Sequence, residues 1–532
     1  MKIIVTDPLA PEGVEDLEKQ AAEEGLDLVV DLAYGLEPVD LLERIGEYDG
    51  LIVRSGTKVT ADVIEAGRNL RVIGRAGTGV DNIDLRAATQ AGVLVVNAPT
   101  ANCRAAAEHA VALMFALARR IARADASVRH GEWKRRQFMG VQISGKVLGL
   151  VGLGRVGSEV VRRVKGLGMT VLAYDPYLST ERARGLGVEL ANLDDLLAQA
   201  DFVSMHTPLT EETRGLIGAR EIALMKPTAY LINCARGPVI EESALLEALG
   251  QGQIAGAGLD VFAQEPPSNS PLLANPNVVL TPHLGASTEE AQVEVAREVT
   301  RDVLDGLLGR PVRNAVNAPI FSPEMLEALV PYIDLAERLG RLAVQIAGRN
   351  IGRIHITYGG RLTDHDVTPI KAAVIKGLLE PISEERINQV NANLVAQRRG
   401  LIIVEEKRPH LDVEQFRNLI TLRVGEEDAA REVSGTLRWG EPLLVRIDEY
   451  WINLVLRGYM LICTNLDRPG MIGQVGTMLG HEDVNISFMQ VGRDRPLGYA
   501  VMAIGLDDAP PEGLLNEIQN VEDIYSAQLV KV

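Results

Sequence analysis

The chain has 532 residues, of which 46% are hydrophobic and 24% charged, and its formal net charge at pH 7 is -18. This balance is typical of a folded protein with several domains; it argues against a disordered chain, and no apolar run is long enough to span a membrane. The negative charge argues against a nucleic-acid or anionic-membrane partner, because either would require a basic surface.

Short β-type runs alternate with helical patterns through the first hundred residues. The runs are KIIVTD, LDLVVD, GLIVRS, LRVIGRAG and VLVVNAP. Such alternation predicts parallel strands joined by helical crossovers, and therefore an α/β sheet. At Thr100 the pattern changes to a long alanine-rich helical stretch that continues to Trp133, which we interpret as the hinge into a second α/β domain.

The second domain is predicted from a glycine motif between a strand and a helix. Gly152, Gly154 and Gly157 follow the apolar run KVLGLV, and a second run, TVLAYD, ends in Asp175. In a dinucleotide site the glycines admit the pyrophosphate, the helix N-terminus stabilises its charge, and the acidic residue accepts from both ribose hydroxyls. A carboxylate there repels a 2′-phosphate, which favours NAD over NADP. The alternative is a turn aspartate before Pro176.

Polar residues follow four later strands of the same sheet. The strands begin DFVSM, AYLIN, GAGLD and VVLTP, and the residues are Thr207, Arg236, Asp260, Glu265 and His283. Ligands of open α/β sheets bind outside the carboxyl ends of the strands, so these side chains are expected to face one site. Taken singly, Arg236 is interpreted as a surface arginine, Glu265 as a rim carboxylate before a Pro-Pro turn, and His283 as a loop histidine.

Together, Arg236, Glu265 and His283 supply what hydride transfer from a 2-hydroxy acid requires. Histidine is the natural base for the hydroxyl proton near neutral pH. Arginine holds a carboxylate with a two-pronged fork, and a buried glutamate would orient the imidazole and favour its protonated form. This chemistry requires no metal, and no cluster of metal ligands is visible in the sequence.

Five motifs strongly resemble those of the D-isomer-specific 2-hydroxyacid dehydrogenases over about residues 1–318: GRAGTGVDNIDL, GLVGLGRVGSEV, NCARGPVIEESAL, LDVFAQEPP and TPHLGAST. The resemblance implies a Rossmann NAD-binding domain inserted in a flavodoxin-like substrate domain, with the chain returning to the first domain after about residue 286. Arg236, Glu265 and His283 match the catalytic trio. Besides the three glycines, Arg236 and His283, the positions that match NAD contacts are Thr78, Arg155, Val156, Asp175, Thr207, Cys234, Ala235, Asp260, Gly285 and Ala286. Pro238 departs from the family, in which a second glycine is common.

Within the family, the chain most resembles long enzymes that oxidise 3-phospho-D-glycerate to 3-phosphohydroxypyruvate, the first step of L-serine biosynthesis. Arg54 and Arg75 match positions that hold the phosphorylated substrate, and Arg135 resembles a position that reaches a neighbouring subunit's site. Arginines at these positions of an acidic protein suit a doubly anionic substrate. The alternative is that they are scattered surface arginines.

The last 200 residues resemble two further domains. Runs such as RIHITYGG and GLIIVEEK predict an α+β region that resembles the intervening, allosteric substrate-binding-like domain of the long enzymes. The final segment has the order β-α-β-β-α-β, which is ferredoxin-like. NLDRPGMIGQVGTML and VNI resemble an ACT domain, a module that binds amino acids between paired copies. Asn465, Asp467 and Asn485 match its ligand positions, which implies L-serine as an effector. The alternative for Asn485 is a turn residue at the start of a strand.

The expected organisation is a homo-oligomer, either a dimer or a tetramer. Its domains are a substrate-binding domain (1–99), an NAD-binding domain (100–286), a return segment (287–318), an intervening domain (319–455) and an ACT domain (459–532). Widely separated Cys103, Cys234 and Cys463 favour a reducing cytoplasm. Two alternatives remain open: a hydroxypyruvate, glyoxylate or 2-oxoglutarate reductase, and a corepressor-like NAD-sensing protein.

Overall fold

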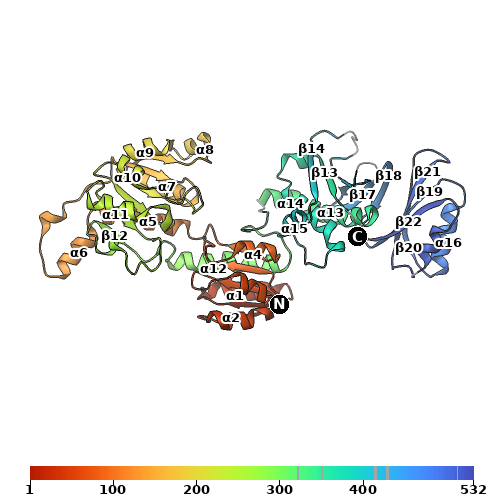
Figure 1. Cartoon of the computed structure of the whole chain (residues 1–532), viewed down its shortest axis with the longest axis horizontal. Helices are drawn as coiled ribbons and strands as arrows, with labels where there is room; N and C mark the ends of the chain where they lie inside the picture. The colour runs from red at the N-terminus through yellow and green to blue at the C-terminus, as the bar shows by residue number, and fades with distance from the viewer. Residues whose placement is uncertain (320–322, 349–350, 412–415, 427–429, 512) are drawn as a thin grey trace.

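The computed structural model describes residues 1–319, 323–348, 351–411, 416–426, 430–511 and 513–532. Four sheets follow one another in chain order, and Figure 1 shows the first two on one side of an elongated molecule and the last two on the other. None of the helices in the described ranges combines the length and the apolar character needed to cross a bilayer.

The first sheet is parallel, with the strand order β2-β1-β3-β4-β5. Its strands are β1 (Lys2–Val5), β2 (Val29–Leu32), β3 (Gly50–Val53), β4 (Val72–Arg75) and β5 (Leu94–Asn97). Its helices are α1 (Pro11–Glu23), α2 (Pro38–Arg44), α3 (Ala61–Ala66) and α4 (Leu85–Gln90). Central β3 is buried along its whole length, as expected when helices cover both faces. The order is flavodoxin-like, which confirms the predicted fold of this part.

The chain returns to the first sheet through α12 (Glu289–Leu307), which packs against α1, β4 and β5. Val295, Val299 and Val303 recur every fourth residue along α12 and are buried in the core of that sheet. This apolar stripe is the sequence feature that holds the returning helix to the first domain.

The second sheet is also parallel, with the order β12-β11-β10-β9-β6-β7-β8. Its strands are β6 (Val147–Val151), β7 (Thr170–Tyr174), β8 (Glu189–Leu190), β9 (Phe202–Met205), β10 (Tyr230–Asn233), β11 (Gly256–Leu259) and β12 (Val278–Leu280). The helices are α5 (Cys103–Ala118), α7 (Arg155–Gly166), α8 (Thr180–Gly185), α9 (Leu193–Gln199), α10 (Ala219–Leu224) and α11 (Glu242–Gly250). The strand order reverses between β6 and β9, and this is the Rossmann switch point where dinucleotides bind.

The alanine-rich stretch predicted as one long helix is divided into α5 and α6 (Ile121–Arg129). Arg120 between them has a left-handed φ of 51°, and the carbonyl of Ala118 accepts from the amide of Val141 instead of continuing the helix. Tertiary pairing therefore overrides the local helical pattern. In Figure 1, α6 projects from the second domain on the side away from the first.

The third sheet has the order β14-β13-β15-β16-β17-β18. Its strands are β13 (Arg353–Gly360), β14 (Ile402–Arg408), β15 (Asn418–Val424), β16 (Arg431–Arg438), β17 (Glu441–Ile447) and β18 (Tyr450–Val455). Its helices are α13 (Pro323–Ala347), α14 (Thr368–Leu379) and α15 (Ala392–Arg398). The third domain is therefore α+β, as predicted.

The fourth sheet is antiparallel, with the order β20-β21-β19-β22. Its elements are β19 (Tyr459–Leu466), α16 (Met471–His481), β20 (Ile486–Arg493), β21 (Tyr499–Leu506), α17 (Leu514–Gln519) and β22 (Ile524–Lys531). This is the predicted ferredoxin-like fold. The face of the sheet opposite its helices packs into the core of the third domain through Met460, Ile462, Val501, Ala503 and Val530.

Candidate active site

The glycine motif forms the expected turn between β6 and α7. Gly152 has a φ of 96°, and a Cβ there would lie 2.7 Å from the carbonyl oxygen of His206, so only glycine suits this turn. Gly154 caps α7 with no side-chain hydrogen bond and with open space beside it, while Gly157 is buried in the first turn. Arg155 and Val156 are the first residues of α7, whose uncapped amides offer an anion site.

Asp175 and Thr207 lie at the carboxyl ends of β7 and β9, on either side of this turn. The Asp175 carboxylate accepts from the amides of Leu153 at 2.9 Å and Tyr177 at 3.0 Å. The Thr207 hydroxyl is buried and has no hydrogen-bond partner among the described residues. An orphaned hydroxyl, an uncapped helix and a carboxylate with spare lone pairs fit a dinucleotide. The contact of Asp175 with the amide of Tyr177 is also what the alternative, a turn aspartate before Pro176, predicts.

Replacing Asp175 tests its proposed preference for NAD. We expect Asp175→Ala to shift the ratio of kcat/KM with NADP to kcat/KM with NAD upward by roughly 10-fold to 100-fold, because a charged acceptor is lost. Asp175→Asn is the matched variant, since its side-chain oxygen keeps one turn contact while the charge is removed. Steady-state kinetics with both cofactors measure the ratio. An unchanged ratio in both variants would leave Asp175 a turn residue only.

His283 and Glu265 form a contact pair after β12 and β11. The Nδ1 atom of His283 lies 2.7 Å from Oε2 of Glu265, and the other oxygen of Glu265 accepts from the amide of Phe262 at 3.1 Å. An ionised carboxylate only accepts, so the proton of neutral His283 is on Nδ1 and Nε2 is left as the base. The prediction that Glu265 is buried is wrong: its side chain is 37% exposed because a Pro-Pro turn follows it.

The turn that carries His283 is tied to Asp260, which is completely buried. The carboxylate of Asp260 accepts from the hydroxyl of Thr281 at 2.6 Å and from the amides of Leu284 at 2.7 Å and Gly285 at 2.8 Å. Burial acts to raise the pKa of Asp260, but these bonds and neighbouring His109 offset it, and the pKa is lowered. Asp260 is therefore a buried anion inside the turn.

Arg236 lies after β10 and reaches the first domain. Its Nε donates to Asp81 at 3.2 Å, and its Nη1 donates to the carbonyl of Ala235 at 2.8 Å. A Cβ on Gly79 would lie 2.0 Å from Nη2 of Arg236, so the arginine packs directly against the loop after β4. The ion pair therefore brings the carboxyl edges of the two sheets together.

Arg75, at the end of β4, lies within electrostatic reach of both Arg236 and Arg54. Desolvation, followed by repulsion from Arg236 and Arg54, lowers the pKa of Arg75 to about 10. Its Nε atom is buried with no hydrogen-bond partner among the described residues. Arg54 donates weakly to the carbonyl of Pro8, at 3.3 Å. Three clustered cations with an unsatisfied donor make a site for an anion that carries more than one charge.

The other predicted contact residues surround this edge, with one exception. Thr78 donates to Asn102 at 2.8 Å where the chain passes from the first domain to the second. Ala286 accepts from Gln292 at 2.7 Å where the chain returns to the first domain. Cys234 and Ala235 follow β10, and burial raises the pKa of the Cys234 thiol far above its usual range. Arg135 is the exception: it lies in an exposed turn beyond α6, so within one chain it is separate from the arginine cluster.

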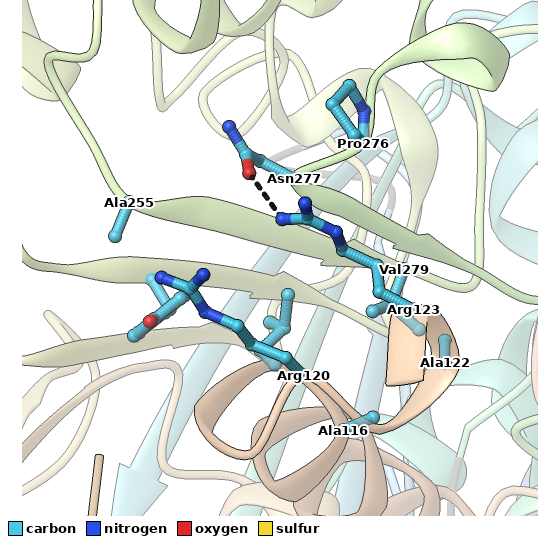
Figure 2. A pocket seen from close by; sticks show the side chains of 10 residues that line it. Ala116, Arg120, Ala122, Arg123, Ala255, Pro276, Asn277 and Val279 are labelled. Atoms are coloured by element: carbon cyan, nitrogen blue, oxygen red, sulfur yellow. Dashed lines mark hydrogen bonds between the residues drawn. The ribbon is translucent and has the colours of Figure 1, made fainter. Parts of the chain in front are cut away.

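A separate hollow lies at the opposite, amino-terminal edge of the second sheet. It is lined by Tyr230, Ala255 and Asn277, which stand at or just before the starts of β10, β11 and β12, and by Arg120 and Arg123. Figure 2 shows Arg123 directed at Asn277, with which it makes a long contact of 3.4 Å. Because the strands are parallel, this hollow is at the other end of the strands from His283.

The three predicted effector residues do not meet within one chain. Asn465 lies at the end of β19, and Asp467 beyond it accepts from Arg493 at 3.0 Å. Asn485 precedes β20 and donates to Asp507 at 2.6 Å. Strand pairing through β21 places the start of β20 level with the start of β19, so Asn485 and Asn465 stand at opposite ends of the sheet. The Oδ1 atom of buried Asn465 has no partner among the described residues.

The chain matches three family models in succession. Residues 111–285 match the NAD binding domain of the D-isomer specific 2-hydroxyacid dehydrogenases, residues 328–448 the D-3-phosphoglycerate dehydrogenase intervening domain, and residues 459–523 the ACT domain. A D-lactate dehydrogenase structure from Escherichia coli covers 59% of this chain and 100% of its own, with 29% identity and a TM-score of 0.53.

Two full-length relatives span all four sheets. A D-3-phosphoglycerate dehydrogenase from Synechocystis is 46% identical over 100% of this chain and 95% of its own length. One from Archaeoglobus fulgidus is 42% identical over 100% of both chains. With the NAD-binding, intervening and ACT models matched in order, the chain belongs to the D-3-phosphoglycerate dehydrogenases within the D-isomer specific 2-hydroxyacid dehydrogenase family.

Proposed function

We propose that this protein oxidises 3-phospho-D-glycerate to 3-phosphohydroxypyruvate with NAD, the first step of L-serine biosynthesis. The observation that carries the proposal is the convergence of Arg54, Arg75 and Arg236 beside a domain that supplies His283 paired with Glu265. A substrate with a carboxylate and a phosphate offers one anionic group to Arg236 and another to Arg75 and Arg54, whereas a substrate with one carboxylate engages only part of this cluster, in which Asp81 and Asp7 also lie. The names of the relatives support the same substrate.

In the proposed mechanism, Arg236 holds the substrate carboxylate and Arg75 and Arg54 hold the phosphate. The Nε2 atom of His283 then accepts the proton of the C2 hydroxyl, while Glu265 keeps the imidazole oriented through Nδ1 and balances the charge that forms. Bound NAD supplies the hydride acceptor. In the reverse direction the His283 imidazolium returns the proton to the oxygen on C2.

A substrate panel tests the proposal. The purified chain is assayed by NADH appearance at alkaline pH with 3-phosphoglycerate, and by NADH consumption with hydroxypyruvate, glyoxylate and 2-oxoglutarate. We expect 3-phosphoglycerate to be oxidised efficiently and the three unphosphorylated 2-oxo acids to be reduced only slowly. Preference for an unphosphorylated substrate would favour one of the alternative reductases, and binding of NAD without turnover of any substrate would favour the corepressor-like reading.

We also propose that the enzyme works as a cytoplasmic homo-oligomer, a dimer or a tetramer. The segment 119–141 carries large apolar side chains on its surface: Ile121, Val128, Trp133 and Met139 are 53%, 55%, 78% and 77% exposed. Apolar exposure of this extent in one segment is typical of a protein contact. Arg135, in the same segment, is then available to a partner's site. The free thiols of Cys103, Cys234 and Cys463 are in keeping with a reducing compartment.

L-serine is the proposed effector of the ACT domain. A zwitterion needs acceptors for its ammonium and donors for its carboxylate, and Asp467 with the amides of Asn465 and Asn485 offers both. Because Asn485 stands at the other end of the sheet from Asn465, a complete site requires Asn485 from a second copy. Serine binding would therefore tie two chains together, with a coupling to the active site of about 1–3 kcal/mol.

Calorimetric titration with serine tests this proposal. We expect the wild type to bind and Asn485→Ala to lose binding, while Asn516→Ala, an exposed asparagine on α17, behaves as the wild type. Substitution is preferable to removing residues 458–532, because truncation would uncover the apolar face that packs on the third domain. If the wild type shows no binding at millimolar serine, the sensing proposal fails while the dehydrogenase assignment stands.

A further inference from the structure

His109 is a second histidine at the active-site edge that the sequence motifs did not single out. It lies on α5, and its Nε2 atom is 2.9 Å from the hydroxyl of Thr281 and 3.2 Å from a carboxylate oxygen of Asp260. Its side chain is 19% exposed. Thr281 begins the turn that carries His283, so His109 contacts this turn from the helix beneath it.

The hydrogen-bond pattern determines which ring nitrogen of His109 carries a proton. The Thr281 hydroxyl has a single hydrogen, and it donates to Asp260 at 2.6 Å. Toward His109 the hydroxyl oxygen can therefore only accept, and the carboxylate of Asp260 also only accepts. The Nε2 atom of His109 must be the donor to both. His109 thus completes a ring of three polar side chains beneath the turn.

The turn needs this support because its backbone is strained. His283 has a φ of 56°, in the left-handed region that is unfavourable for a residue with a Cβ. The amide of His283 donates to the carbonyl of Asp260 at 2.9 Å, and the next two amides donate to its carboxylate at 2.7 and 2.8 Å. Asp260 therefore holds the turn, and His109 with Thr281 holds Asp260.

We propose that His109 is a positioning residue that, through Thr281 and Asp260, keeps His283 aligned for proton transfer. The inference rests on the role given to His283 in the proposed function. It assigns no direct contact with substrate to His109. The donor at Nε2 matters, rather than the charge or the bulk of the ring, because the two atoms that face it are acceptors.

The first test follows the turn itself and needs no substrate. Hydrogen exchange of the amides of Thr281 and of residues 283–287 is measured in the full-length enzyme without ligand. We expect faster exchange in His109→Leu and in Thr281→Val, which breaks the same ring with a side chain of similar shape. Met114→Ala, a buried change on the same helix away from the turn, should lower the melting temperature and leave this exchange unchanged. Wild-type exchange in His109→Leu would overturn the proposal, and it would do so even if exchange in Thr281→Val were faster.

The second test separates positioning from packing. We expect His109→Leu to lower kcat about 10-fold to 100-fold, the scale on which small misplacement acts, with the KM for 3-phosphoglycerate within twofold of the wild type. His109→Gln keeps a donor at the same reach and should recover most of the rate. If His109→Gln is as impaired as His109→Leu, the imidazole of His109 only fills space and does not position His283 through a hydrogen bond, and the proposal is wrong. A wild type without turnover would defeat the proposed function, whereas the exchange result would still decide the role of His109.

Discussion

His283→Asn should lower kcat by roughly 100-fold to 10,000-fold, the usual range for loss of a general acid-base group. The fall corresponds to about 2.7–5.5 kcal/mol of activation free energy. Asparagine is suited to the test because it tolerates the left-handed backbone that His283 adopts at a φ of 56°. Its amide can still reach toward Glu265, but it cannot accept a proton from the substrate hydroxyl. The backbone of the turn should therefore survive while the base is lost.

The measurement combines steady-state kinetics with NAD binding followed by fluorescence. NAD affinity should remain within a few-fold of the wild type, since the glycine turn and Asp175 are untouched. His410→Asn, a change of the same type at an exposed histidine that follows β14 in the third domain, serves as the control and should be fully active. A near-normal rate in His283→Asn would remove this residue from the mechanism and leave it as a hydrogen-bonded loop histidine.

The sequence predicts those parts of the site that follow regular strands. Thr207, Arg236, Asp260 and His283 could be grouped because each follows an apolar run, and carboxyl ends of parallel strands share an edge. The glycine motif also follows an apolar run, β6, and its position predicted the turn before α7. The alternation of short apolar runs also predicts an α/β sheet in the first domain and the ferredoxin-like order of the last domain, whereas the flavodoxin-like fold and the inserted arrangement were implied by the family resemblance.

The remaining features depend on tertiary contacts that no local pattern contains. His109 lies in an alanine-rich helix and reads as one more helical residue, although a single histidine between the buried positions Ala106 and Ala110 was a signal of an internal partner. The pairing of Asp81 with Arg236 joins residues 155 positions apart. Glu265 was expected to be buried by its pairing with His283, yet the turn through Pro266 and Pro267 leaves it at the rim.

Arg75→Ala is the second change expected to have a large effect, and it tests the identity of the substrate. For 3-phosphoglycerate, kcat/KM should fall by roughly 30-fold to 1,000-fold, or about 2–4 kcal/mol, because a half-buried cation loses its anionic partner. Repulsion from Arg236 and Arg54 and a buried Nε without a partner show that Arg75 is held in place at a cost, which bound phosphate would offset. For D-glycerate, which lacks the phosphate, the loss should stay within about threefold.

Two further variants are compared with Arg75→Ala, one as a control and one as a second arginine of the cluster. Arg68→Ala removes an exposed arginine just before the amino end of the same strand, and it should change neither substrate's kinetics. Arg54→Ala should show the same preference as Arg75→Ala but a smaller loss, since the Arg54 guanidinium already donates to the carbonyl of Pro8. If Arg75→Ala weakens both substrates equally, its charge does not meet the phosphate. Arg75 would then have a packing role, since its Nη1 lies against Gly77 in the loop after β4.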